Sequence, residues 1–315
     1  MEINYTSFYL KDKKTAKNKE ILSKSQNCLP YIDMHTHSIY SDGELEPNQL
    51  FKEAIKNNVG TIAITDHDTL LGNKNILYGD NHQETRRLHI INGIELSAKV
   101  DRGRMHILGY DFDINDFDLN KKMTELRTNS LYSVLALINQ IKKDYNIIFS
   151  VEDIQEIINN KGNIGRPHLA RLLVKYKYAK DINEAFSKYL VDAYNKTKYS
   201  NKGIKDEECI SLIKKAKGLA VLAHPNQLKM TDFELEDTLK KLIYCGLDGI
   251  EVYHSSHTKD EVKKYLTLAN KYNLLISGGS DYHGKNIKPD ILLGSGINGN
   301  VKIKQLSLLD HIKNR

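Results

Sequence analysis

The stretch YIDMHTHSIYSDGELEP, residues 31–47, places two histidines at the end of an apolar run and an aspartate in the turn that follows. Side chains at positions i and i+2 of a β-strand point to the same side, so His35 and His37 face one point. Ser41-Asp42-Gly43 is typical of a turn, which can return the Asp42 carboxylate toward the two imidazoles. This convergence of nitrogen and oxygen atoms indicates a metal site, although a His-x-His pair alone more often marks half-exposed strand histidines.

The composition is that of an ordinary globular protein. Of the 315 residues, 40% are hydrophobic and 27% charged, which is enough for one large domain or two small ones. No apolar stretch approaches the ~20 residues of a membrane span, and the start of the chain lacks the apolar core of a signal peptide. We therefore predict a cytoplasmic protein without a membrane partner. The net charge of +6 suits an anionic substrate but is too small to predict a nucleic-acid-binding surface.

Apolar runs with the length and composition of strands recur along the chain, and amphipathic segments follow most of them. This alternation predicts a parallel sheet covered by helices, either a closed barrel or an open doubly wound sheet. The runs are 31–37, 61–65, 89–96, 105–110, 218–223, 248–253 and 274–278. Residues 111–217 contain only helical patterns, so we expect them to form a helical insertion that caps the strand ends.

Almost every predicted strand carries or precedes a candidate metal ligand. In α/β barrels such groups gather at the rim where the strands end, so one shared site is expected. The candidates are His35, His37, Asp66, His67, Asp68, Glu95, His106, His224, Glu251, Asp281 and His283. The repetition predicts a polynuclear metal site. Imidazole and carboxylate without thiolate favour manganese, iron or zinc, among which the sequence does not choose.

The ordered motifs of this chain resemble those of the PHP (polymerase and histidinol phosphatase) family of metal-dependent phosphoesterases, over roughly residues 31–295. The motifs that carry the resemblance are DMHTHSIYSDGELEP, ITDHDT, GIELSA, LAHP and GGSDYHG. GRPHLA at 165–170 is similar to the insertion of the TrpH-type branch. The resemblance implies an α/β fold, a distorted (β/α)7 barrel with a helical insertion.

The resemblance also implies domain boundaries. A discontinuous PHP barrel would comprise 31–110 and 218–300, with the cap at 111–217. An N-terminal extension (1–30) and a C-terminal tail (301–315) would lie outside the family core.

By the same resemblance, three divalent metal ions are bound. The first would be held by His35, His37, Glu95 and Asp281. The second would be held by Asp42, His67 and His283, and the third by Glu95, His106 and His224. Glu95 would bridge two of the ions.

The implied activity is hydrolysis of nucleotide phosphoesters by in-line attack of a hydroxide activated on the metals. Expected substrates are 3′,5′-bisphosphates such as pAp, or the 5′ ends of short oligonucleotides degraded from 5′ to 3′. Arg166 and His168 are predicted as catalytic and substrate-binding residues, and His254 as a further substrate contact. The alternatives are that Arg166 simply opens a helix and that His254 is an ordinary loop histidine.

Two other functions remain open. Histidinol-phosphate phosphatases share the barrel and the ligands, but the insertion with Arg166 argues against that activity. A non-catalytic PHP module of a nucleic-acid assembly is a further alternative, disfavoured because every ligand position is filled. The exact substrate and the oligomeric state are not predicted.

Overall fold

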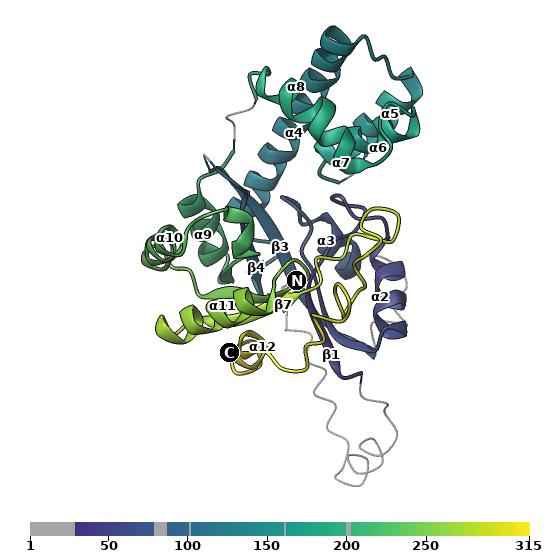
Figure 1. Cartoon of the computed structure of the whole chain (residues 1–315). Coiled ribbons are helices and arrows are strands. Elements are labelled where there is room, and N and C mark those ends of the chain that lie inside the picture. The colour runs from purple at the N-terminus through teal and green to yellow at the C-terminus, as the bar shows by residue number, and fades with distance from the viewer. Residues whose placement is uncertain (1–28, 79–86, 101, 161, 200–202) are drawn as a thin grey trace, which may run out of the picture.

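Seven strands form one sheet, and their order in the sheet follows their order in the chain. The structure, a computed structural model, describes residues 29–78, 87–100, 102–160, 162–199 and 203–315 (Figure 1). The strands are β1 (Tyr31–Thr36), β2 (Val59–Ile64), β3 (His89–Ala98), β4 (Met105–Tyr110), β5 (Leu219–Leu222), β6 (Gly249–His254) and β7 (Leu275–Gly279). Each lies within about two residues of a predicted run, because apolar stretches bounded by polar turns are buried strands.

The sheet nearly closes into a barrel through the segment that follows β7. Thr36 of β1 forms a parallel bridge with Tyr282. The Asp281 N–H donates to the His35 carbonyl at 2.8 Å, and the His37 N–H donates to the Tyr282 carbonyl at 2.9 Å. The predicted distorted (β/α)7 barrel is confirmed, and its closure places the residues after β7 beside those at the end of β1.

The expectation of an all-parallel sheet is wrong at β4. This strand pairs antiparallel with both β3 and β5, whereas the other neighbours in the sheet are parallel. The reason is the short loop 99–104 between β3 and β4, since a parallel connection needs a crossover of a dozen residues or more. The reversal matters for the site, because it brings the first residues of β4 to the rim where the other strands end.

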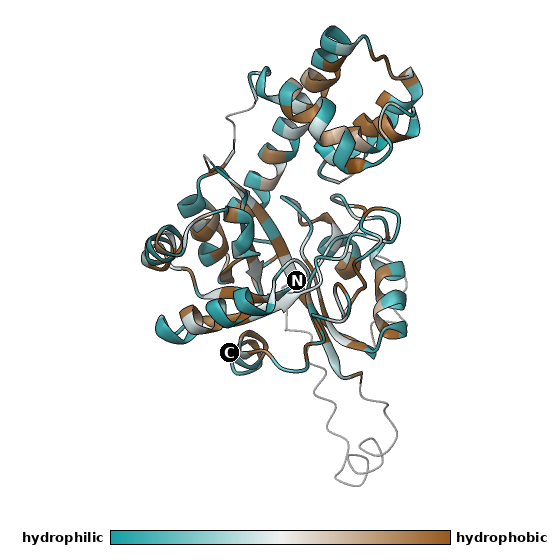
Figure 2. Ribbon diagram, in the orientation of Figure 1, coloured by the Kyte–Doolittle hydropathy of each residue, from teal (hydrophilic) through white to brown (hydrophobic). Residues whose placement is uncertain are grey.

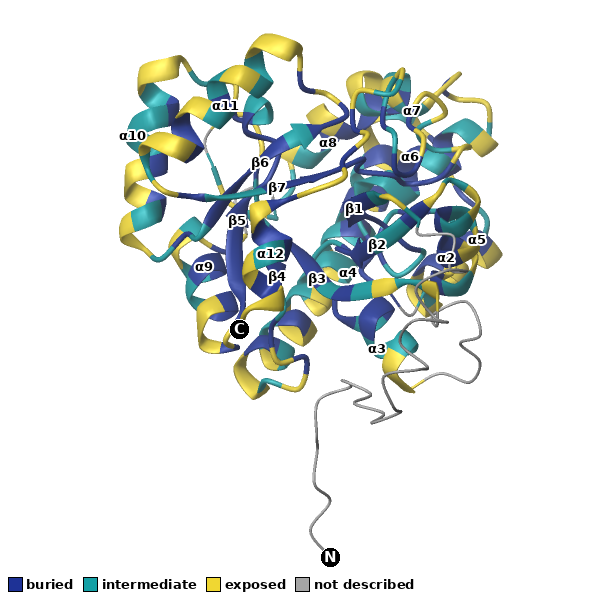
Figure 3. Ribbon diagram, turned by 90° about the horizontal axis from the view of Figure 1, so that it is seen from below, coloured by how far each residue is buried: buried dark blue, intermediate teal, exposed yellow. Residues whose placement is uncertain are grey.

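Amphipathic helices cover the outside of the barrel. In α2 the buried residues Leu50, Phe51 and Ala54 form the face that packs on β2. Figure 2 shows hydrophobic residues along the strands and on alternating turns of the helices, and Figure 3 shows buried strands inside a ring of partly exposed helices. The helices of this layer are α2 (Pro47–Lys56), α3 (Leu71–Tyr78), α9 (Asp206–Lys215), α10 (Asp232–Tyr244) and α11 (Lys259–Lys271), with a 3₁₀ turn at Pro225–Leu228. The last helix, α12 (Ser307–Lys313), lies at the lower end of the barrel and packs against a separate cluster of strand residues (Figure 3).

The other helices form a separate bundle beside the barrel, which we call the cap (Figure 1). Its own hydrophobic cluster extends from Val134 to Ala193 and includes Leu137, Leu169 and Leu190, all fully buried. The elements are α4 (Phe117–Tyr145), α5 (Val151–Asn159), α6 (Arg166–Lys175), α7 (Ile182–Ala185), a π-helical turn (Phe186–Leu190) and α8 (Val191–Asn195).

The hydrophobic contacts of 111–217 divide between the two cores. Leu119 and Met123, in the first turns of α4, pack in the barrel cluster together with α9, while Leu137 and Ile141 further along α4 pack in the cap. The contacts therefore favour a cap smaller than 111–217, and the predicted boundaries stay a prediction. At the C-terminus, Leu308 of α12 is buried against the barrel strands.

Two further predictions concern the N-terminal extension and the absence of a membrane span. Residues 1–28 of the predicted N-terminal extension lie outside the described residues. Among the described helices, none is both long and apolar enough to cross a membrane.

Candidate metal centre

All nine predicted ligands lie at one rim of the barrel. His35 is in β1, Glu95 is in β3, and most of the others follow directly after a strand. His106 is the second residue of β4, and it reaches the same rim only because β4 runs antiparallel to its neighbours. The remaining positions are His37 and Asp42 after β1, His67 after β2, His224 after β5, and Asp281 and His283 after β7.

The Glu95 carboxylate lies at the centre of this group and is 1% exposed. Three imidazoles face Oε2 and two face Oε1. The distances to Oε2 are 3.1 Å from His35 Nε2, 3.2 Å from His37 Nε2 and 3.3 Å from His67 Nδ1, and those to Oε1 are 2.7 Å from His106 Nδ1 and 2.8 Å from His224 Nε2. A carboxylate whose two oxygens serve separate sets of imidazoles has the geometry required of a bridge between metal ions.

Side chains around Glu95 form groups in which one ligand atom from each member lies within 4.8 Å of the others. Two of these groups contain the first and second predicted ligand sets, the second with His37 added. The groups are His35–His37–Glu95–Asp281, His37–Asp42–His67–His283, His67–Glu95–His106 and His35–Glu251–His254. His224 joins the third predicted set through Glu95 and through His106 Nδ1, which is 3.2 Å from its Nε2.

The protonation of these groups fits cation binding. Burial lowers the pKa of His67 to about 3 and that of His224 to about 4, so both imidazoles are neutral at pH 7 and offer lone pairs. Burial opposes ionisation of Glu95, but His67, His35 and His106 outweigh it and hold the pKa of this carboxyl well below its usual range. Burial also opposes protonation of His37, but the nearby carboxylates of Asp281 and Glu95 outweigh it and raise the pKa to about 9, so a cation must displace a proton there.

Two further observations fit a metal. The buried atoms His37 Nε2 and His67 Nδ1 lie within 3.3 Å of Glu95 Oε2, but neither forms a well-aligned hydrogen bond in the described structure. His224 and Asp281 have φ angles of 23° and 57°, in the left-handed region that residues other than glycine rarely adopt. Such strained backbone is typical of functional sites. The donor set and its unsatisfied atoms therefore suit divalent cations.

Glu251 was a candidate in the sequence, but its position in the site could not be predicted. It is fully buried in β6, where its Oε1 accepts from His35 Nδ1 at 2.9 Å and its Oε2 accepts from the His224 N–H at 2.7 Å. The first of these bonds leaves His35 Nε2 as the atom that faces Glu95. Carboxylates in this position orient a ligand histidine and raise its basicity.

Buried acids also anchor the loops that carry ligands. Asp66 accepts from the Ser38 N–H at 2.7 Å and from the Ser41 hydroxyl at 2.8 Å, which fixes the turn before Asp42. Asp33 accepts from the Ser280 N–H at 2.8 Å, next to Asp281. Their proximity in sequence to predicted ligands was the available signal.

The cap is docked on the rim by polar contacts that the sequence analysis missed. Asn163 donates through Nδ2 to the His67 carbonyl at 3.1 Å, and through its backbone to the Tyr40 carbonyl at 2.7 Å. Arg171 of α6 donates to the Asp42 carbonyl. The cap and two ligand-bearing loops are therefore directly linked.

A cleft of about 410 Å³ separates the cap from the metal centre, and Asp42, His67 and His106 line it. Arg166 and His168, at the start of α6, line the same cleft from the cap side. Burial lowers the pKa of His168 to about 4, and the Gly165 N–H donates to its Nδ1 at 3.2 Å. The side chain is therefore a neutral imidazole with its proton on Nε2, a hydrogen-bond donor rather than a strong acid.

His254, predicted to contact substrate, is 2% exposed and is not among the residues that line the cleft. Its Nε2 is 3.4 Å from Asp281 Oδ2, and its Nδ1 is 2.8 Å from the Ser256 hydroxyl. Its substrate role stays a prediction, and its geometry favours contact with Asp281.

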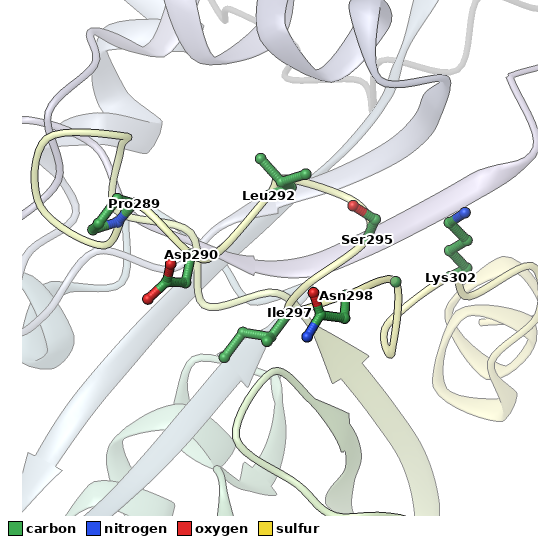
Figure 4. Close-up of a pocket in the computed structure, with 8 residues that line it drawn as sticks. Pro289, Asp290, Leu292, Ser295, Ile297, Asn298 and Lys302 are labelled. Carbon is green, nitrogen blue, oxygen red and sulfur yellow. The ribbon is translucent and has the colours of Figure 1, made fainter.

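A second cavity, of about 550 Å³, lies in the loop after β7 (Figure 4). Asp290, Ser295, Asn298 and Lys302 line it together with apolar side chains. None of the predicted metal ligands contributes to its lining, so it is separate from the centre described above.

The fold and the rim of imidazoles and carboxylates define a metal-dependent hydrolase. Residues 33–277 match the PHP domain, and the chain belongs to this family. The family and the class of metal-dependent phosphoester hydrolase, both predicted from the motifs, are thus confirmed.

Several relatives match most of the chain. A 3′,5′-nucleoside bisphosphate phosphatase of Chromobacterium violaceum is 30% identical over 80% of this chain and 87% of the relative. A phosphoribosyl 1,2-cyclic phosphate 1,2-diphosphodiesterase of Eggerthella lenta is also 30% identical, over 80% of this chain and 94% of the relative. The 5′-3′ exoribonuclease Rnm of Escherichia coli is 30% identical over 82% of this chain and 86% of the relative. Identity alone therefore does not choose among their substrates.

A solved structure shows the same fold. An amidohydrolase from Chromobacterium violaceum, with bound sulfate and no metal, superimposes with a TM-score of 0.76 at 26% identity. The match covers 90% of this chain and 96% of that chain.

Proposed function

We propose that this protein hydrolyses phosphoesters of nucleotides, either 3′,5′-bisphosphates or the 5′ ends of short oligonucleotides, with three divalent metal ions. The observation that carries the proposal is the Glu95 carboxylate surrounded by five imidazoles beside a cleft that Arg166 lines. The names of the relatives support the substrate class, since two of them act on bisphosphates or on RNA ends.

Nine residues would hold the metals. Glu95 would bridge two ions, and the ligand sets would be those predicted from the motifs: His35, His37, Glu95 and Asp281; Asp42, His67 and His283; Glu95, His106 and His224. When bound, divalent ions lower the pKa of water and neutralise the charge of a phosphoryl group. Manganese, iron and zinc all suit this donor set.

The chain's own residues would bind the phosphate groups of the substrate. Arg166 offers a planar guanidinium, which binds phosphate oxygens through paired hydrogen bonds. His168 would offer its Nε2–H to the reacting phosphate. Because its pKa of about 4 keeps it neutral, its role would be to orient the phosphate rather than to protonate the leaving oxygen.

The test is an assay of purified protein on pAp, AMP, histidinol phosphate and a 5′-phosphorylated short RNA. We expect chelation to abolish hydrolysis, and Mn²⁺, Fe²⁺ or Zn²⁺ to restore it on pAp or on the RNA. Full activity after metal removal would refute the metal requirement. Preference for histidinol phosphate would establish the alternative activity, and a metal-loaded protein inactive on every substrate would favour a non-catalytic module.

A further inference from the structure

Two basic side chains between β3 and β4 line the cleft below the cap. Lys99 and Arg104 are exposed, and they line the same cleft as Arg166. Across the described residues, none of these three cations forms an ion pair with a carboxylate. Their neighbour Arg102 differs, because its guanidinium lies 2.9 Å from Glu234 Oε2. Of these four basic side chains, the three without a carboxylate partner are therefore the ones that line the cleft.

The backbone at Lys99 and at Arg104 is held in place by hydrogen bonds. The Lys99 N–H donates to the Ile204 carbonyl at 2.7 Å, and the Arg104 N–H donates to the Gln227 carbonyl at 2.9 Å. Gly103 has a φ of 73°, and a Cβ there would lie 2.4 Å from the Leu228 carbonyl oxygen, so only glycine fits. The two cations therefore project from a fixed support.

Arg166 is also held on the opposite side. Its guanidinium carbon lies 4.6 Å from the centre of the Tyr194 ring and 6.0 Å from that of Phe186, both within reach of cation–π attraction. Burial lowers the pKa of Arg166, and the charge of Arg104 adds to this lowering despite the opposing effect of Tyr194. Two guanidinium groups that feel each other's charge repel unless an anion lies between them.

We propose that Arg104 and Arg166, with Lys99 at the rim, form a binding site for a second phosphate of the substrate, one that is not hydrolysed. The inference rests on the proposed function, because the reacting phosphate would lie at Glu95. Arg171, the other arginine of α6 near the cleft, is occupied by the Asp42 carbonyl. The site therefore selects substrates that carry two phosphates, such as a nucleoside 3′,5′-bisphosphate.

The experiment compares Arg104→Gln with Arg102→Gln, a control two residues away whose guanidinium pairs with Glu234. With Mn²⁺ present, kcat/KM is measured on adenosine 3′,5′-bisphosphate and on p-nitrophenyl phosphate, which has one phosphate. We expect Arg104→Gln to lower kcat/KM by about 10- to 100-fold on the bisphosphate, and much less on p-nitrophenyl phosphate, as for loss of one hydrogen bond to a charged group. Arg102→Gln should leave both values near those of the wild type.

A binding measurement separates this inference from the proposed function. Calorimetry with the chelator-treated protein gives the affinity for adenosine 3′,5′-bisphosphate without hydrolysis, and Arg104→Gln should weaken it by about 10-fold or more. An equal loss of kcat/KM on both substrates, or unchanged binding in Arg104→Gln, would overturn the second-phosphate site. A wild type inactive on every substrate would contradict the proposed function, while the binding comparison would still decide for or against the site.

Discussion

Substitution of Glu251 by glutamine tests whether a residue outside the nine predicted metal ligands controls metal affinity. In the wild type, one carboxylate oxygen accepts from His35 Nδ1 at 2.9 Å and the other accepts from the His224 N–H at 2.7 Å. Glutamine has only one oxygen, so its amide group must face one of these two donors. The variant therefore loses a charge and leaves one buried donor without an acceptor.

The magnitude follows from these two losses. Removal of a carboxylate that orients a ligand histidine weakens metal binding by about 10- to 100-fold, equivalent to about 1.4–2.7 kcal/mol. The unpaired donor should also lower the free energy of unfolding by about 1–3 kcal/mol. Competition with a coloured chelator gives the affinity, and activity titrated with Mn²⁺ should approach that of the wild type at high metal concentration, because Glu251 is proposed to orient ligands rather than to bind substrate.

The pH dependence of the stability of the metal-free protein provides a second test of the role of Glu251. Burial opposes ionisation of Glu251, but His35 and His254 outweigh it and lower its pKa from 4.5 to about 2. A carboxyl with a lowered pKa stabilises the fold fully above about pH 4.5, and this contribution disappears as the pH falls toward 2. The stability difference between wild type and Glu251→Gln should therefore shrink over that range. Unchanged metal affinity and melting temperature, matching those of the exposed control Glu125→Gln, would refute the orienting role.

Three further substitutions test the centre, the cleft and the cap. Glu95→Gln removes the proposed bridging charge, so elemental analysis should find less metal in a folded variant; normal metal content would count against the bridge. Arg166→Ala should keep its metal but lose about 2–4 kcal/mol in kcat/KM on a bisphosphate, and less on p-nitrophenyl phosphate, whereas an equal loss on both would indicate only a structural role. Gly162→Ala places a Cβ 2.2 Å from the Tyr40 carbonyl oxygen, so the melting temperature should fall; an unchanged value would show that this contact yields freely.

The strands, and the gathering of the candidate ligands at one rim, were predictable because they depend on local sequence. Polar residues directly after apolar runs must lie at the barrel rim, whatever the details of packing. The direction of β4 was missed although the signal was present, since the loop 99–104 is too short for a parallel crossover. The position of Glu251 depends instead on long-range packing. A glutamate within an apolar strand indicates a buried charge, but its partners in β1 and after β5 depend on how the barrel closes.

The contacts of the cap could not be predicted for a related reason. Asn163 and Arg171 donate to backbone carbonyls at the rim. Every residue has such a carbonyl, so the sequence does not show which one accepts. The motif GRPHLA lies at the start of α6, which lines the cleft. Its sequence alone left open whether Arg166 only begins that helix or also faces a substrate. The absence of a paired carboxylate in the described structure favours the second interpretation.

The helix α4 belongs to two hydrophobic cores at once, and this has a consequence for chimeras. Its 29 residues span about 43 Å, with Leu119 and Met123 in one core and Leu137 and Ile141 in the other. Suppose that the cap were exchanged between homologues with the junctions at the ends of α4. The barrel would then lose the apolar side chains of Leu119 and Met123 from its core. A junction inside the helix, between Met123 and Val134, leaves each core with its own residues. It also keeps α4 continuous, so the distance between the barrel and the cap is preserved.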